Sequence, residues 1–280
     1  MPRALQASYA VIIPCKDGEA MIEKTLNALS SQTVKAQKII VIDDASHDQT
    51  PVILRKFPQI KVLRLEHDYP KNFQRVPRLL NMAPRYVPQN CEYLMLLGDD
   101  SILQKDYAEK LIAKFKKNPK LKIASGSMSG TSNVRGLARH PSGSGRMFDL
   151  GFLRKHFPFP ENIGWESWIL FKGLQEGEIA NFPDACYEHE RSYGVYSIRT
   201  FGQSMYTLGY PALFVIARFL KDFFFSEYSS RFHSFYLLLG YAEFYVTGQK
   251  RLVDVVGFVR KTQTERLVNF LRRFPFDGRF

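Results

Sequence analysis

The sequence predicts an α/β fold built on a mainly parallel sheet with helices on both faces. Three observations support this prediction. Short apolar runs typical of buried strands alternate with segments whose apolar residues recur at helical spacing. This alternation continues from residue 9 to about residue 118, as expected for successive β-α-β units. Two of the apolar runs end abruptly in a pair of aspartates, the position where open parallel sheets bind ligands.

The individual elements follow from local pattern. Four apolar runs predict strands at 9–14, 38–43, 61–65 and 93–98. Amphipathic spacing predicts helices at 19–32, 50–57, 75–87, 106–118 and 164–178. Residues 127–146 are rich in Gly and Ser and predict a long loop, and loops of that length are usually functional or mobile.

Composition sets limits on the class of protein. The chain has 280 residues, of which 45% are hydrophobic and 24% charged, as in folded globular proteins. Its formal net charge of +12 favours an anionic partner, such as a phosphorylated small molecule, a membrane surface or a nucleic acid. The three cysteines are isolated and lack zinc-site spacing. With no signal-like segment and no long uncharged apolar run, we expect a cytoplasmic protein without a simple membrane span.

The two aspartate pairs, Asp43-Asp44 and Asp99-Asp100, carry the functional argument. Both follow predicted strands, so we expect them in one crevice at the carboxyl edge of the sheet. Adjacent carboxylates repel each other and raise each other's pKa unless a cation intervenes. Mg²⁺ or Mn²⁺ would meet this need, because both prefer oxygen ligands and share them with substrate phosphates. The alternative is that Asp44 and Asp100 are solvated residues that cap the following segments.

The ordered motifs resemble those of the inverting GT-A glycosyltransferases of family 2. The matching segments are VIIPCKDGEAMIEKTLNALSSQ, IIVIDDASHDQT, RLLNMA and YLMLLGDDS, and the resemblance extends over residues 9–195. It implies a GT-A catalytic domain at 1–195, with a Rossmann-like, mainly parallel sheet. The remaining 196–280 would form a C-terminal helical region.

The resemblance also implies a set of donor-binding residues. Nucleotide binding is expected of Pro14, Cys15, Glu19, Asp44, Arg78 and Asp99. Asp100 and His189 are the expected ligands of Mn²⁺ or Mg²⁺, and Arg191 is expected to bind the diphosphate. Gly98 stands where many members have the first aspartate of a D-x-D motif. The implied reaction moves a sugar from a UDP-, GDP- or dTDP-sugar to the hydroxyl of a glycan, polysaccharide or lipid-linked acceptor.

Inversion needs a base on the acceptor side, at the start of a helix lining the pocket. Members of the family carry an acidic pair there, whereas this chain has Glu166 followed by Ser167. Glu166 is therefore the expected catalytic base, and Glu161 is the fallback. The alternative for Glu166 is an acid in the first turn of a helix, where the helix dipole favours it.

The C-terminal helices are rich in aromatic and basic residues, which has two interpretations. They either pack as a subdomain on the catalytic core or lie on an anionic membrane, and the two interpretations are compatible. Two other functions compete with glycosyl transfer. A nucleotidyltransferase would normally need a Gly- and Lys/Arg-rich loop that PCKDGEA does not supply. A basic binding module would leave the acidic pairs unexplained, and we expect no nucleic-acid partner.

Overall fold

The computed structural model describes residues 8–67, 74–129, 140–189, 196–225 and 231–273. The chain divides into two compact units, and each is described by itself. The sheet unit consists of residues 1–161 and 176–191, and the helical unit of residues 162–175 and 192–280. The domain boundary near residue 195, expected from the sequence, stays a prediction.

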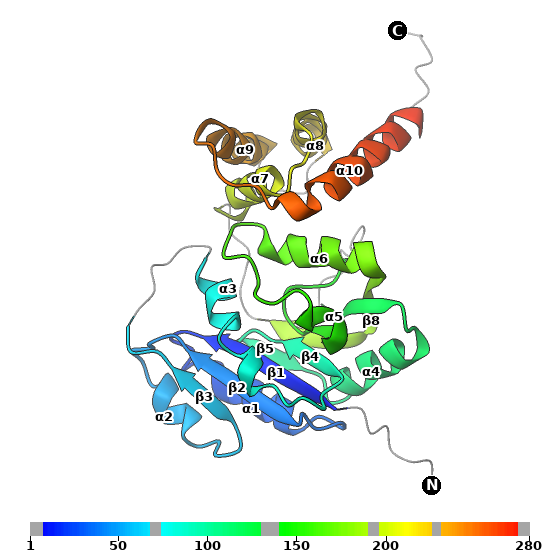
Figure 1. Cartoon of the computed structure of the whole chain (residues 1–280). Coiled ribbons are helices and arrows are strands. Elements are labelled where there is room, and N and C mark those ends of the chain that lie inside the picture. Colours follow the sequence, from blue (N-terminus) through cyan, green and yellow to red (C-terminus); the bar gives the residue numbers. More distant parts are fainter. Residues whose placement is uncertain (1–7, 68–73, 130–139, 190–195, 226–230, 274–280) are drawn as a thin grey trace. The chain divides into compact units, whose positions relative to one another are not determined.

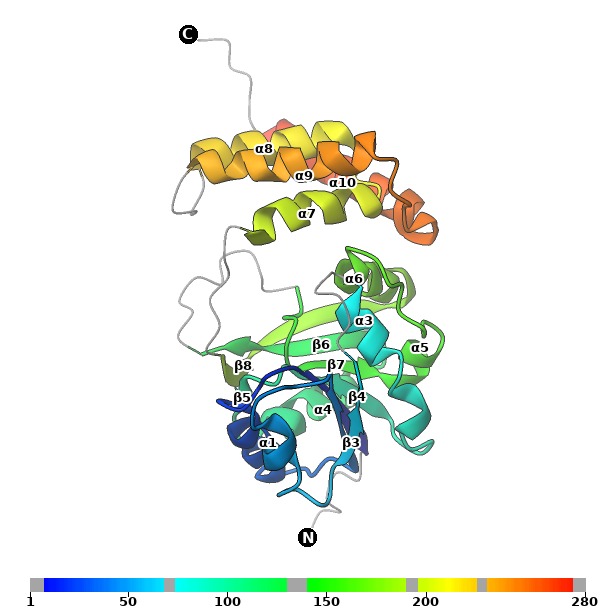
Figure 2. The ribbon, with the colours of Figure 1, turned by 90° about the vertical axis from the view of Figure 1, so that its left-hand side faces the viewer.

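The sheet unit contains an eight-stranded mixed sheet (Figures 1 and 2). Its strand order is β3-β2-β1-β4-β7-β6-β8-β5. The first four strands in this order are parallel, and they are the four predicted runs: β3 (Lys61–Arg64), β2 (Lys38–Asp43), β1 (Tyr9–Cys15) and β4 (Tyr93–Leu96). The predicted α/β fold with a parallel core is thus confirmed.

Four further strands extend the sheet, and the strand pattern did not predict them. They are β5 (Ser101–Leu103), β6 (Leu121–Met128), β7 (Arg146–Asp149) and β8 (Glu178–His189). β7 runs antiparallel to β4 and β6, and β5 runs antiparallel to β8. The pairing of β6 with β8 contains register shifts, one of them between Gly126 and Ser127. Such irregularity, and the proline at 183, removes the strict alternation by which a strand is detected in sequence.

Helices cover both faces of this sheet. Figure 1 shows α1 (Ile22–Ser30) and α2 (Thr50–Leu54) below the strands and α3 (Arg75–Leu80) above them. The core on the α1 side also contains α4 (Tyr107–Lys117). Consecutive residues of β1, such as Val11 and Ile12, point to opposite faces of the sheet. Both are fully buried, because the strand is covered on both sides. The remaining elements here are the 3₁₀ turn η1 (Pro84–Tyr86) and α5 (Leu150–Arg154).

The helical unit contains α6 (Trp165–Glu176) except for its last residue, which belongs to the sheet unit. Its other elements are α7 (Tyr196–Thr207), α8 (Ala212–Phe225), η2 (Arg231–Ser234), α9 (Phe235–Val246) and α10 (Val253–Arg273). Helices α7 and α9 cross at two glycines. A Cβ at Gly202 would lie 2.0 Å from the Leu237 carbonyl oxygen, and one at Gly240 would lie 2.0 Å from that of Arg199. Only glycine allows this backbone contact. Among the described helices, none combines the length and apolar character that crossing a bilayer requires.

Candidate functional site

Two loops at the carboxyl edge of the parallel strands are tied into one structure. The loop after β1 turns sharply at Asp17 (φ +48°), and the loop after β2 turns at Ala45 (φ +49°). Reciprocal hydrogen bonds join them: Asp17 N to Ser46 Oγ (2.9 Å), Gly18 N to Thr50 Oγ1 (2.8 Å), Glu19 N to Asp48 Oδ2 (2.9 Å) and Gln49 N to Glu19 Oε2 (2.9 Å). Glu19 therefore contributes to the shape of this edge, and its role in nucleotide binding stays a prediction.

The first aspartate pair separates into two different sites. Asp43 and Asp44 are both fully buried. Asp43 accepts hydrogen bonds from the Ser46 amide (3.0 Å) and from Arg64 Nη1 (2.7 Å), so it holds the loop after β2. Asp44 instead contacts the guanidinium of Arg75, at the start of α3. The two carboxylates are thus neutralised by two different arginines.

Arg75 is the residue that the sequence prediction missed at this site. Its side chain is only 14% exposed, so the ion pair with Asp44 is largely shielded from water. Among the described residues, neither Asp44 Oδ1 nor Arg75 Nη2 has a hydrogen-bond partner, although both atoms are buried. A buried acceptor next to a buried donor matches the hydrogen-bonding edge of a nucleobase. No local pattern marked Arg75, because it lies 31 residues from Asp44 in the chain.

We expect Arg75→Met to lower the free energy of unfolding by about 3–5 kcal/mol, because the substitution leaves the carboxylate of Asp44 buried and unpaired. Urea unfolding measures this change. The matched control is Lys56→Met, which removes a cation from an exposed pair with Glu23 and should cost less than about 1 kcal/mol. A cost for Arg75→Met no larger than that of the control would show that the Asp44 pair is not shielded.

Asp99 lies beside the end of β1. Its Oδ2 accepts a hydrogen bond from the Lys16 amide at 3.4 Å, and its backbone carbonyl accepts one from Thr25 Oγ1 at 2.9 Å. Burial, and then the neighbouring carboxylate of Asp99, raises the pKa of the Cys15 thiol above its usual range. The structure therefore brings Cys15 and Asp99 together, and Pro14 precedes Cys15 on β1. Their roles in nucleotide binding stay predictions.

Asp100 meets His189 across two strands that are far apart in sequence. Ser101 on β5 is paired in register with His189 on β8, and Asp100 Oδ1 lies 3.3 Å from His189 Nε2. The side chain of Asp100 is 6% exposed and that of His189 is 16% exposed. The two residues expected as metal ligands thus form one cluster at the sheet edge.

Gly98 is explained by the position of Asp100. A Cβ at residue 98 would come within 2.8 Å of Asp100 Oδ1 and within 3.2 Å of the hydroxyls of Ser101 and Ser144. Ser144 accepts a hydrogen bond from the Gly98 amide (2.9 Å) and shares one with the Ser101 hydroxyl (2.6 Å). The Gly-Asp-Asp turn is therefore held by Ser144, a residue of the Gly/Ser-rich segment that was predicted to be a long loop.

The chemistry of the cluster fits a divalent cation in part. Within the described ranges, no group of three or more His, Cys, Asp or Glu residues could hold a metal ion. Asp100 and His189 alone supply a carboxylate oxygen and an imidazole nitrogen. Mg²⁺ and Mn²⁺ commonly take one or two protein ligands and complete their coordination with substrate phosphates and water. Two protein ligands therefore suit a metal that binds together with a diphosphate.

Arg78 and Glu161 form an exposed ion pair in the sheet unit. Arg78 Nε lies 3.0 Å from Glu161 Oε2, with side-chain exposures of 36% and 40%. One turn further along the chain, Asn81 bonds the backbone of Phe159 through both its amide oxygen (2.7 Å) and its amide nitrogen (2.9 Å). Asn81 thus has a structural role in holding the segment that leads to Glu161. The expected contact of Arg78 with the nucleotide stays a prediction.

Glu166 belongs to the helical unit, in the first turn of α6, and its side chain is exposed. Its neighbours Trp165 and Trp168 are 9% and 7% exposed. The indole of Trp168 donates to both carboxylate oxygens of Asp254, at 3.1 and 3.0 Å, and so anchors α6 to α10. The ring of Trp168 thus packs inside the helical unit, whereas the side chain of Glu166 is exposed. Arg191, the expected diphosphate ligand, lies outside the described residues.

Comparisons with known proteins concern the family and the fold of the chain. A family model described as Glycosyl transferase family 2 matches residues 10–177. The poly-beta-1,6-N-acetyl-D-glucosamine synthase of Staphylococcus epidermidis is 29% identical over 126 residues, which are 44% of this chain and 28% of that protein. The match therefore spans little more than a quarter of the curated relative.

Two solved structures show the same fold. A fragment of S. aureus TarS in complex with UDP-GlcNAc has a TM-score of 0.56 and 16% identity, covering 84% of this chain and 71% of that one. The mannosyltransferase PcManGT from Pyrobaculum calidifontis, in complex with GDP-Man and Mn²⁺, has a TM-score of 0.57 and 16% identity, covering 96% and 81%. The predicted GT-A fold with added C-terminal helices is thus confirmed.

Proposed function

Because the chain belongs to glycosyl transferase family 2, we propose that it transfers a sugar from a nucleotide-diphosphate sugar to an acceptor hydroxyl, with inversion at the sugar carbon. The observation that carries this proposal is the single edge of the sheet unit that holds two acidic centres. Asp100 meets His189 there, and Asp44 meets Arg75. A nucleotide diphosphate needs recognition of both its base and its phosphates, and one centre suits each of these groups.

The base would bind at the Asp44–Arg75 centre. Asp44 Oδ1 accepts and Arg75 Nη2 donates, and these buried atoms have no partner within the described ranges. A planar base edge that satisfies both atoms regains hydrogen bonds that the free protein lacks. We assign the surrounding contacts with the nucleotide to Pro14, Cys15, Glu19, Arg78 and Asp99, on the resemblance to the family.

The diphosphate would bind at the Asp100–His189 centre together with Mn²⁺ or Mg²⁺. When bound, such an ion supplies positive charge that stabilises the nucleoside diphosphate as it leaves. Asp100 and His189 are the residues that would hold it, and their 3.3 Å contact already places both donors at one point. The structures of PcManGT and of the glucosyl-3-phosphoglycerate synthase from Mycobacterium tuberculosis, which has a similar fold with a TM-score of 0.56 and 17% identity, contain Mn²⁺ with a nucleotide, which supports a divalent cation here. We assign Arg191 to the same diphosphate.

Glu166 would accept the proton of the acceptor hydroxyl. It is exposed, it lies in the first turn of α6, and it is the only carboxylate in the motif NIGWESW. A carboxylate that removes this proton as the bond to the sugar forms raises the nucleophilicity of the oxygen, and it would return the proton to solvent afterwards. Glu161, the fallback, forms an ion pair with Arg78.

The similar proteins support a class of donor and a class of acceptor. Structures of the same fold hold UDP-GlcNAc and GDP-Man, so we propose a UDP- or GDP-sugar as the donor. The curated relative is a synthase of a polysaccharide. For this chain we propose a glycan, polysaccharide or lipid-linked acceptor, of which the hydroxyl group is the shared chemistry.

A thermal-shift screen of nucleoside diphosphates and nucleotide sugars, with and without Mn²⁺, tests the proposal. We expect one nucleoside diphosphate to raise the melting temperature by several degrees, because a ligand at 100 times its dissociation constant adds about 2.7 kcal/mol of stability. The shift should shrink after EDTA treatment. Stabilisation by nucleoside triphosphates alone, independent of any sugar nucleotide, would instead favour a nucleotidyltransferase.

A further inference from the structure

Helix α8 carries an exposed apolar stripe along its whole length. Leu213, Ile216, Leu220 and Phe224 recur at intervals of three and four residues, and they are 65%, 47%, 46% and 68% exposed. The opposite side of the helix is buried at Val215. Soluble monomers rarely expose a contiguous apolar surface of this extent unless it binds a partner.

The neighbouring helix also exposes large apolar residues. Figure 2 shows α8 and α9 side by side, and the two helices are in contact within the helical unit. The inner side of α9 packs on α7 through Gly240, while its other sides expose large apolar residues. These residues, together with one from the preceding turn, are Phe232, Phe235, Tyr236, Leu239, Tyr245 and Val246.

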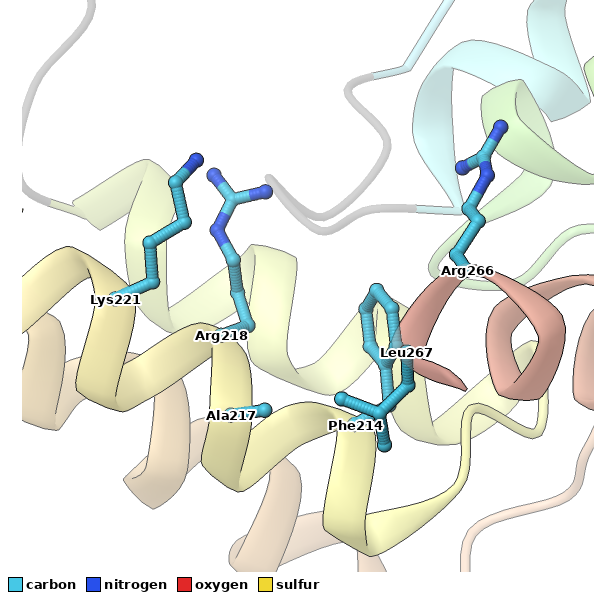
Figure 3. Close-up of a pocket in the computed structure, with 6 residues that line it drawn as sticks. All are labelled: Phe214, Ala217, Arg218, Lys221, Arg266 and Leu267. Carbon is cyan, nitrogen blue, oxygen red and sulfur yellow. The ribbon is translucent and has the colours of Figure 1, made fainter. Parts of the chain in front are cut away.

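A cationic pocket lies on the flank of α8. Its floor is apolar, from Phe214, Ala217 and Leu267, and it is bordered by Arg218, Lys221 and Arg266. Figure 3 shows the three cationic side chains extending to the same side from α8 and α10. Asp222 is the carboxylate that pairs with Arg218, at 2.7 Å, so the pocket keeps an excess of positive charge.

The apolar stripe and the cationic pocket of α8 are arranged like the apolar and basic residues of a helix that lies at a membrane surface. With roughly 100° of rotation per residue, Lys221 lies about a quarter-turn from the centre of the apolar stripe. Arg218, which pairs with Asp222, lies nearly opposite the stripe, on the far side of the pocket. Interfacial helices place basic residues beside their apolar face, where the cations reach lipid phosphates. Helix α8 has 14 residues, about 21 Å, and is too short to cross a hydrocarbon layer of about 30 Å.

We propose that the α8–α9 surface docks on an anionic lipid bilayer, with the apolar stripe in the interface and a lipid phosphate bound by Lys221 and Arg266 of the pocket. The net charge of +12 favours an anionic occupant. A second copy of the chain suits the surface less well, because a two-fold interface would bring equivalent cationic surfaces together. This inference does not depend on glycosyl transfer, since it concerns binding alone.

Flotation of the full chain with vesicles tests the proposal. We expect it to bind vesicles of phosphatidylcholine with about 30% phosphatidylglycerol, and to bind pure phosphatidylcholine much more weakly. Lys221→Gln/Arg266→Gln should weaken binding to the anionic vesicles by about 30-fold, at about 1 kcal/mol per cation. Leu220→Ser/Phe224→Ser should weaken binding to both kinds of vesicle by at least about 10-fold.

Two controls match these variants in the sheet unit. Lys116→Gln/Lys117→Gln removes the same charge from the exposed end of α4, and Val52→Ser removes an exposed apolar side chain from α2. Both should bind vesicles nearly as the unmodified chain does, and circular dichroism should show that every variant is folded. Absence of binding to anionic vesicles at low salt would overturn the proposal, as would equal losses in the pocket and control variants. A dimer that Leu220→Ser/Phe224→Ser dissociates, without any vesicle binding, would assign the surface to self-association instead.

Discussion

Asp100→Ala should abolish sugar transfer and the metal-dependent part of nucleotide binding while the sheet unit stays folded. The carboxylate is nearly buried at the Gly-Asp-Asp turn, and it lies 3.3 Å from His189. Without this carboxylate, His189 would be the one residue of the pair left to bind a divalent cation. We expect a loss of transfer of about 10³-fold or more, equivalent to about 4 kcal/mol of transition-state stabilisation.

Titration calorimetry with the nucleoside diphosphate, with and without Mn²⁺, measures the binding part of this prediction. The control is Asp184→Ala on β8, the strand that carries His189. Asp184 is 51% exposed and pairs with Lys114 at the surface, so its loss should leave both transfer and binding nearly unchanged. Near-normal turnover in Asp100→Ala would refute the metal assignment, whatever the behaviour of the control.

Glu166→Gln should retain donor binding and lose transfer. The amide preserves the size of the side chain but does not accept the proton of the acceptor hydroxyl. General-base catalysis contributes roughly 10²- to 10⁴-fold, so we expect kcat to fall within that range while the KM for the donor changes little. Steady-state kinetics with the donor varied, and calorimetry of donor binding, measure the two quantities.

The alternative interpretation of Glu166 gives a different result. An acid in the first turn of a helix stabilises the helix by about 0.3–1 kcal/mol and has no part in the chemistry. Glu23 provides the matched case, because it lies in the first turn of α1. If Glu166→Gln only lowers the free energy of unfolding, by as much as Glu23→Gln does, the base must be another residue. Weakened donor binding would point to a role at the nucleotide.

The aspartate pairs show what a local sequence pattern predicts and what it leaves open. Asp43 and Asp44 look equivalent in sequence, and only their position after a strand marks them. In the structure Asp43 binds Arg64 and the loop after β2, whereas Asp44 contacts Arg75. Successive residues of an extended chain project to opposite sides, so neighbouring carboxylates meet different partners. Which arginine each one meets depends on the packing of β3 and α3, and no local rule contains that information.

In the helical unit, too, the sequence predicted the helices, and only the structure shows how they pack. Aromatic and basic residues in 196–280 indicated helices with two open interpretations, a packed subdomain or a membrane surface. The structure shows a packed unit in which α7 and α9 touch at Gly202 and Gly240, and it also leaves the outer faces of α8 and α9 exposed. Spacing along a helix predicts an apolar face but does not tell whether another helix covers it.

By itself, the sequence determined the four parallel strands, the helices between them and the acidic pairs at one sheet edge. These features depend on periodicity and on residues adjacent in the chain, which short-range sterics and burial control. Only the tertiary structure decided that Asp100 meets His189, that Arg75 neutralises Asp44 and that Ser144 holds the turn at Gly98. These contacts join residues 31 to 89 positions apart. They therefore depend on strand register and loop packing, which are established only when the whole sheet has assembled.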